Sequence, residues 1–311
     1  MKKGYFYDAV TNNTIQLLNL MNMKGPRDIT LHTAVAFFLV IPSFFSFNNC
    51  EAQTLASGID TLSANRNITS RALRQIRNTA YHTGEKLEFR IKYTGITAVT
   101  TEISVPKDTV IRGQDCYHIV YTAKTVPFFE NFFPVNDRYE SIIHKEGQYP
   151  MYFRQQIREG KFSHDDEVEF FHESAIARSY HHNKDFPMEA FTQDVISAYF
   201  FVRTLNLRSY KNDDVITIQN FSSDKSFPLI IKVRNRDLLE TEIGTVRTIV
   251  LEPLVQGQGL FKSEGKILVW VTDDENKVPV KISMKVPVGS LYAEIISATG
   301  LKNPITSKLN E

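Results

Sequence analysis

Residues 86–93 read Lys86-Leu87-Glu88-Phe89-Arg90-Ile91-Lys92-Tyr93, with an apolar side chain at every second position. This period of two is typical of a strand with one face in the core and the other in water. The stretch at 278–286, Val-Pro-Val-Lys-Ile-Ser-Met-Lys-Val, has the same alternation. Both stretches therefore predict half-buried strands, the arrangement found in antiparallel sheets.

Further strand-like stretches follow residues 86–93 at short intervals along the chain. We predict strands over 97–106, 116–124, 139–144, 152–156, 167–172, 175–180, 215–218, 229–233, 246–252, 266–272 and 291–298. The turn-rich sequence Asp273-Asp274-Glu275-Asn276-Lys277 joins two of them as a hairpin. These spacings favour neighbouring antiparallel strands in a single sheet.

One segment interrupts the succession of strands. Residues 195–205 are apolar on nearly all sides when placed on a helix, which predicts an enclosed helix rather than a surface one. Thr192 is the expected N-cap, and Asp194 suits the positive end of the helix. We therefore predict a mainly β fold, in which one large antiparallel sheet curls into a half-open barrel around one buried helix at about residues 194–205.

The composition is that of an ordinary globular protein. The chain has 311 residues, 42% of them hydrophobic and 23% charged, and a formal net charge of +1. Extended disorder, collagen and coiled coil are excluded by these values. The balanced charge argues against a nucleic-acid partner, which would require a concentrated basic face.

The N-terminal segment has the pattern of a secretory signal. Lys24 and Arg27 precede an apolar run over 31–47, and the small residue Ala52 follows it. We predict a signal peptide over 1–52, with a true start at Met21 or Met23, then a flexible lead-in over 53–80 and a single β-rich domain over 81–311. The protein is then expected to be exported, to the periplasm or beyond the cell.

Two alternatives compete at this leader. A membrane anchor needs about 20 apolar residues, and this shorter run is interrupted by Pro42. A lipoprotein signal would attach lipid at Cys50, but the residues 47–49, Phe-Asn-Asn, lack the small residue that such processing prefers. Once the signal is removed, we do not expect the mature chain to be an integral membrane protein. The mature chain keeps only Cys116, which predicts no internal disulfide and a small buried apolar side chain.

Several short sequence pieces occur together in a characteristic order. They are Gly84-Glu85; residues 136–141, Asn-Asp-Arg-Tyr-Glu-Ser; Tyr149-Pro150; Gln193-Asp194 with Ser197 and Arg203; Gly244-Thr245; Trp270 with Thr272-Asp273-Asp274 and Pro279; and Gly289-Ser290. In these pieces, from about residue 81 to 300, the chain resembles a family of exported bacterial proteins known only as a domain of unknown function.

This resemblance implies export and a mostly antiparallel β architecture. It implies no catalytic residues. Val99 departs from the family pattern, which often has glycine after the first strand, and this places a close backbone approach there in doubt. A further likeness, to the half-open barrels of periplasmic lipoprotein carriers, is an analogy at the level of fold alone.

The aromatic residues suggest a ligand site. Phe128, Phe132, Tyr139 and Trp270 could line an apolar cavity, since a sheet too large for its own side chains to fill leaves space for a ligand. The alternative is plain core packing, because aromatic side chains dominate protein cores. These four residues are the candidate ligand-binding residues.

Four polar residues are candidates for structural roles: Asp137, Asp194, Arg203 and Asp274. Asp194 and Arg203 lie about two and a half helical turns apart, so they cannot pair with each other. Each needs a partner from a strand if the helix is enclosed, and Asp137 and Arg138 are the predicted partners. Asp273-Asp274 could be an acid–base pair, but aspartates at a turn more often accept from backbone amides.

A histidine-rich and acidic region raises the question of a metal site. It comprises residues 164–167, His-Asp-Asp-Glu, with His172, His181 and His182. Alternation places His164, Asp166 and His172 on one face with Val168 and Phe170. The spacing matches no recognised metal motif, and we interpret the region as a solvated hairpin with polar ends.

The chain has no GxSxG, HExxH or P-loop sequence. We therefore predict no catalytic residues, no metal and no cofactor. The first hypothesis is an exported non-catalytic protein that binds a hydrophobic or envelope-derived ligand, or a partner in the cell envelope. The alternatives are a hydrolase acting on envelope glycan or lipid, and a purely structural interaction protein.

Overall fold

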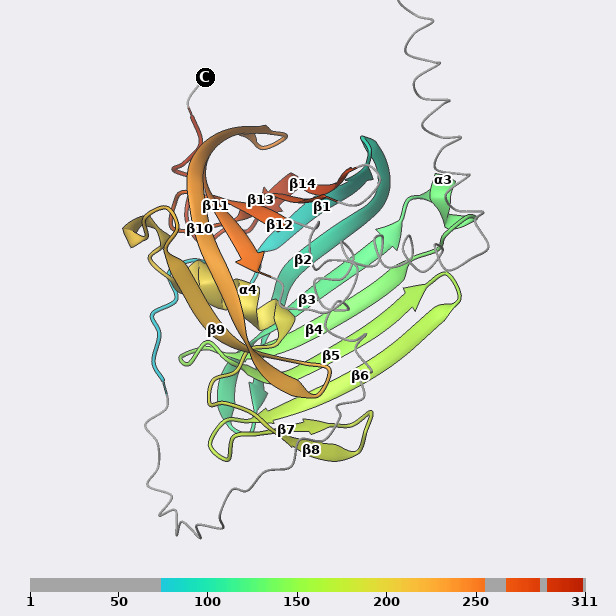
Figure 1. Ribbon diagram of the computed structural model, residues 1–311, viewed down its shortest axis with the longest axis vertical. Helices are drawn as coiled ribbons and strands as arrows, with labels where there is room; N and C mark the ends of the chain where they lie inside the picture. The colour runs from blue at the N-terminus through green and yellow to red at the C-terminus, as the bar shows by residue number, and fades with distance from the viewer. Residues whose placement is uncertain (1–73, 255–266, 286–289, 310–311) are drawn as a thin grey trace, which may run out of the picture.

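The computed structural model describes residues 74–254, 267–285 and 290–309. One antiparallel sheet contains every strand of these residues, in the order β8-β7-β6-β5-β4-β3-β2-β1-β14-β13-β12-β11-β10-β9. The sheet curls strongly but does not close, so β8 and β9 are its two edges (Figure 1). The predicted leader over 1–52 lies outside the described residues.

The strands follow one another mostly as hairpins. Their bounds are β1 Lys86–Tyr93, β2 Ile96–Ile111, β3 Gln114–Thr125, β4 Asn136–His144, β5 Pro150–Glu159, β6 Phe162–Phe171, β7 Ile176–Ser179, β8 Lys184–Pro187, β9 Val215–Ser222, β10 Lys225–Thr241, β11 Gly244–Leu254, β12 Ile267–Thr272, β13 Pro279–Lys285 and β14 Ser290–Thr299. The first and last strands, β1 and β14, pair side by side and join the two halves of the sheet.

Alternation determines which face of the sheet is buried. In β1 the residues Leu87, Phe89, Ile91 and Tyr93 are buried while their neighbours are half-buried. The same pattern in β4 and β5 contributes buried residues to one large apolar cluster. A right-twisted sheet of this width curls on itself, so its inner face can cover a helix.

The helix α4 (Val195–Thr204) lies within the curl and packs against β4 and β9 (Figure 1). Seven of its ten residues are buried, on several sides of the helix. The predicted half-open barrel around one buried helix is therefore confirmed. Two further short helical segments are described, α3 (Pro127–Glu130) and the 3-10 turn η2 (Leu207–Ser209).

The predicted N-cap of this helix is wrong by two residues. Asp194, not Thr192, caps α4: its Oδ1 accepts from the backbone N–H groups of Ile196 (2.7 Å) and Ser197 (2.8 Å), and Ser197 Oγ accepts from the N–H of Asp194. The Thr192 hydroxyl instead donates to the carbonyl of Glu189. A chain that enters the helix extended at Asp194 presents that side chain to the free amides.

This assignment predicts different costs for two alanine variants. Asp194→Ala should lower the free energy of unfolding by about 1–2 kcal/mol, because two backbone donors lose their acceptor. Thr192→Ala should cost less, about 0.5–1 kcal/mol, since only one hydroxyl bond is lost. Urea unfolding of both variants measures the two values, and a larger loss for Thr192→Ala would contradict Asp194 as the cap.

Several elements differ from the sequence prediction, and β10 and β8 differ most clearly. Strand β10 runs for 17 residues rather than over 229–233, because a register shift between Val233 and Arg236 hides its alternation. Strand β8 was not predicted, as its four residues are mostly exposed. Residues 74–80, part of the predicted flexible lead-in, pack on the sheet: Ala80 is fully buried, and the Arg74 guanidinium donates to the carbonyls of Gly147 and Gln148.

Cys116 is fully buried on β3, as expected for a small apolar side chain. Burial raises the pKa of its thiol to about 11. Among the helices of the described residues, none is long and apolar enough to span a membrane.

Candidate functional site

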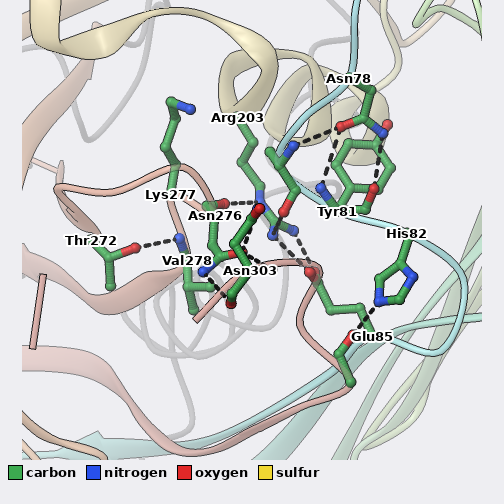
Figure 2. Close-up of polar contacts among 12 residues, drawn as sticks. Asn78, Tyr81, His82, Glu85, Arg203, Thr272, Asn276, Lys277, Val278 and Asn303 are labelled. Atoms are coloured by element: carbon green, nitrogen blue, oxygen red, sulfur yellow. Dashed lines mark hydrogen bonds and ion pairs between the residues drawn. The ribbon is translucent and has the colours of Figure 1, made fainter. Parts of the chain in front are cut away.

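The C-terminal end of α4 carries a buried ion pair. Arg203 and Glu85 are each 1% exposed, and the guanidinium donates to both carboxylate oxygens, Nη1 to Oε1 at 2.5 Å and Nη2 to Oε2 at 2.8 Å (Figure 2). Burial lowers the pKa of the guanidinium, but the Glu85 carboxylate outweighs this and holds the pKa above its ordinary value. The pair is bidentate, the strongest geometry for two such groups.

This ion pair connects four parts of the chain. Arg203 Nε also donates to the carbonyl of Asn276 in the β12–β13 turn, at 2.9 Å. The Asn276 amide in turn donates to the carbonyl of Asn303 (Figure 2). The Asn303 amide itself donates to the carbonyl of Thr79. We call these residues the Arg203 network. The network therefore joins the helix, the start of β1, the β12–β13 turn and the C-terminal segment.

The predicted strand partners of the helix charges are wrong. Arg203 pairs with Glu85, which precedes β1, and Asp194 accepts from Ser141 Oγ of β4 at 2.6 Å. Burial raises the pKa of Asp194 to about 6, although the hydrogen bonds that its carboxylate accepts act to lower this pKa. Arg138, the other predicted partner, faces outward and pairs with Glu140.

Asp274 has the turn contacts expected of an aspartate at that place. Its Oδ1 accepts from Thr272 Oγ1 and from the backbone N–H groups of Asn276 and Lys277, and its Oδ2 accepts from Ser307 Oγ. Asp273 is paired with Arg208 on the surface. Because both carboxylates are engaged in these contacts, they do not form an acid–base pair.

Two further carboxyl groups are buried next to each other. Asp137 of β4 and Glu159 of β5 are within hydrogen-bonding reach, and Asp137 also accepts from the backbone N–H of Arg158 at 2.7 Å. Burial raises the pKa of both groups, and the charge of Asp137 raises that of Glu159 further. We call them the Asp137–Glu159 pair. One proton shared between two carboxyl groups is the favourable state of such a pair.

A partly enclosed hollow lies between the inner face of β5–β6, the start of α4 and the β9–β10 turn. Its volume is about 20 Å³. One wall is apolar and the other polar; the lining residues are Phe153, Gln155, Asp166, Val168, Phe170, Val195, Phe221, Ser222, Ser223 and Asp224. The β9–β10 hairpin lies in front of the β5–β6 region in Figure 1, and its residues Ser222, Ser223 and Asp224 form one side of the hollow.

The β9–β10 turn, which lines the hollow, has an energetically unfavourable backbone conformation. Ser223 and Asp224 both have positive φ, 49° and 60°. Consecutive positive φ values form the tight hairpin turn that matches strand twist, and they usually require Gly or Asn. Here the two positions are Ser223 and Asp224, and both residues line the hollow.

Asp166 is the carboxyl group in the hollow without a matching donor. Its Oδ1 is buried and has no hydrogen-bond partner among the described residues. Burial raises its pKa to about 6, with a further rise from Asp224 and smaller opposing effects from His181 and His182. Asp224 Oδ2 lies 2.6 Å from His182 Nδ1, so that carboxylate is already paired.

The interpretation of this region as a solvated hairpin is wrong for its inner face. His172 is buried, with Nε2 2.6 Å from the carbonyl of Pro150 and burial lowering its pKa to about 4. The predicted alternation is nevertheless present, with Val168 and Phe170 buried beside Asp166. No group of three or more His, Cys, Asp or Glu side chains in the described residues is arranged to hold a metal ion.

The four predicted ligand-binding aromatics lie in three different places. Phe128 and Phe132 are 62% and 51% exposed on and just after α3, with ring centroids 6.2 Å apart. Tyr139 is buried on β4 and contacts Phe153, a wall of the hollow. Trp270 lies on β12, where its indole N–H donates to Asp237 at 3.0 Å. The structure therefore brings only Tyr139 near the hollow.

The chain was compared with curated proteins and with solved structures. No curated protein matches the sequence. A β-barrel-like protein of a domain of unknown function, DUF1849, from Brucella abortus matches with 8% identity and a TM-score of 0.44 over 73% of this chain and 98% of the other. A candidate lipoprotein from Parabacteroides distasonis matches with 6% identity and a TM-score of 0.33 over 73% and 99%.

The family comparison is more direct. Residues 88–296 match the profile of a family described as a protein of unknown function, DUF3108. The chain belongs to the DUF3108 family. This confirms the resemblance inferred from the sequence. The DUF3108 match includes all the residues that line the hollow.

Sequence reasoning missed most of the hollow in this DUF3108 chain. Asp166 was considered only as a metal ligand, although its place on the face of Val168 and Phe170 was a signal of burial. Phe221 and Asp224 had no such signal. They belong to a hairpin that meets β6 only through the curl of the sheet.

Proposed function

We propose that this protein is exported and binds an apolar or amphiphilic ligand from the cell envelope on the inner face of its open sheet. The observation that carries the proposal is the hollow, which has an apolar wall continuous with the large inner cluster. A ligand site of this kind combines apolar lining with a few polar groups that orient the ligand. The division into a leader over 1–52, a lead-in over 53–80 and one domain over 81–311 remains part of this proposal.

The architecture supports access to this face. The sheet ends in two edges rather than closing, and the hollow is covered by a two-stranded hairpin rather than by the rest of the sheet. The hollow itself admits one water-sized group, since a water needs about 10–15 Å³. We infer that one end of the ligand enters the hollow, and that its apolar part lies along the inner face, where burial contributes about 25 cal/mol per Å².

A fluorescent probe tests this proposal. N-phenyl-1-naphthylamine, a neutral apolar dye, should bind saturably and gain fluorescence. Ser222→Trp, which fills the hollow from its polar side, should weaken binding by about tenfold or more, a loss of about 1.4 kcal/mol. Native mass spectrometry of gently purified protein should show a lipid-like added mass that this variant lacks.

Ser163→Trp is the matched control. Ser163 is exposed on β6 outside the hollow, so the same ring added there should leave dye binding unchanged. Equal losses in both variants, or no saturable binding by the unaltered protein, would overturn the proposed site. A single stoichiometric protein partner without a small ligand would favour the interaction protein instead.

A further inference from the structure

The polar side of the hollow has an excess of acceptors. Gln155, Asp166 and Asp224 supply carbonyl and carboxylate oxygens, and Ser222 and Ser223 complete this side. Among the described residues that line the hollow, none is a lysine or an arginine. Asp224 has a partner in His182, whereas Asp166 Oδ1 has none. A buried acceptor of this kind costs free energy unless a ligand or water satisfies it.

The charged and titratable groups around Asp166 come from two turns. Asp224 faces it from the β9–β10 turn, and His181 and His182 face it from the β7–β8 turn. The neighbouring Glu167 contributes a backbone N–H to Asp166. Asp224 is in hydrogen-bonding contact with His182, and ionisation of Asp166 adds a negative charge that no lysine or arginine among the lining residues compensates. The group that fits is therefore a cation.

Size and hydrogen-bonding capacity narrow the choice of cation. The hollow, at about 20 Å³, has room for one water-sized group. A primary ammonium has that size and three donors, which matches a site of several acceptors. A guanidinium is larger, and a quaternary ammonium is larger still and has no donor. The apolar wall beside the acceptors suits the alkyl chain that bears the amine.

We propose that the ligand of this site carries a primary ammonium group, which enters the hollow and donates to the Asp166 carboxylate, while the carbon that bears the amine contacts the apolar wall and the rest of the chain lies outside the hollow. This inference rests on the proposed ligand-binding function and names the chemical class of the ligand. It predicts a preference among chains of equal length that differ only in the head group. Because a charge-assisted hydrogen bond is about twice as strong as a neutral one, the amine should be preferred.

Competition for the bound dye measures this preference. At about pH 7.5, n-octylamine should displace N-phenyl-1-naphthylamine at a concentration about tenfold lower than n-octanol, and n-octanoate should be the weakest competitor. Asp166→Asn should bind the dye but lose the preference for the amine. The preference should also shrink at about pH 5, since burial raises the pKa of Asp166 to about 6 and its protonated form no longer attracts a cation.

Asp165→Asn is the matched control. Asp165 is the neighbouring residue on the opposite face, exposed and paired with Arg158, so it removes the same charge outside the hollow. This variant should keep the preference for the amine. If dye binds but amine and alcohol compete equally, or if both variants lose the preference to the same extent, the ammonium assignment is wrong and the apolar site stands. Failure of the unaltered protein to bind dye would overturn both the ammonium assignment and the proposed apolar site.

Discussion

Arg203→Met is expected to lower the free energy of unfolding by about 3–5 kcal/mol. The substitution removes the guanidinium from a pair that is 1% exposed on each side and leaves the Glu85 carboxylate buried without its counter-charge. It also leaves the Asn276 carbonyl without the donor Nε. Chemical unfolding at neutral pH measures the loss, which should appear as a lower denaturant midpoint with a similar slope.

Two variants control for this result. Arg208→Met removes an arginine from the adjacent 3-10 turn, where its partner Asp273 is on the surface, and should cost less than about 1 kcal/mol. The double variant Arg203→Met with Glu85→Leu should recover part of the loss, because no uncompensated charge remains in the core. If Arg203→Met were as mild as Arg208→Met, the network would not hold these segments together.

The Asp137–Glu159 pair should lower the free energy of unfolding as the pH rises from about 4 to 9, and Glu159→Gln should reduce this loss. Burial raises the pKa of both carboxyl groups above the ordinary value, so at this pair the folded protein binds more protons than the unfolded chain in this range. The slope that the pair contributes to the unfolding free energy is therefore negative, whereas His172, whose pKa burial lowers to about 4, contributes a positive slope below about pH 6.5. The contribution of the pair is fully present below the ordinary carboxyl pKa, near 4, and is lost as the pH rises through the folded value.

The expected size follows from the linkage relation. A rise of one pKa unit corresponds to about 1.4 kcal/mol, so the raised pKa values of the two groups lower the free energy of unfolding by on the order of several kcal/mol at high pH. Glu159→Gln removes the mutual repulsion and should raise the free energy of unfolding at about pH 8 by a similar order, with a smaller effect at about pH 5. Thermal melts of the two proteins across this range provide the measurement.

Glu102→Gln is the comparison variant for this pH dependence. Glu102 is on β2 with its carboxylate on the surface beside Lys86, so its loss should leave the pH profile nearly unchanged. Asp194 and Asp166, whose pKa values burial raises to about 6, contribute to the same fall in stability. The fall should therefore be reduced, not abolished, in Glu159→Gln, and a profile identical to that of the unaltered protein would refute the buried pair.

Local patterns in the sequence predicted most of the secondary structure. Alternation at 86–93 predicted β1 with its observed bounds, and the apolar run at 195–205 predicted the enclosed helix. These features depend on neighbouring residues, because burial of one strand face or of a whole helix requires a periodic or continuous apolar pattern. Only the part of β10 over 229–233 was predicted, since a register shift interrupts the period that identifies a strand.

The contacts between distant residues were decided by the tertiary structure alone. Glu85 meets Arg203, and Asp166 meets Asp224, because a curled sheet brings residues 58 or more positions apart in the chain to one place. A single sequence shows that the charges on an enclosed helix need partners, but many carboxylates satisfy that need equally well. The sequence by itself determined most strands, the enclosed helix and the need of its charged residues for partners. The curl of the sheet decided which residues became those partners. Pairing depends on distances in space, and no local sequence pattern contains those distances.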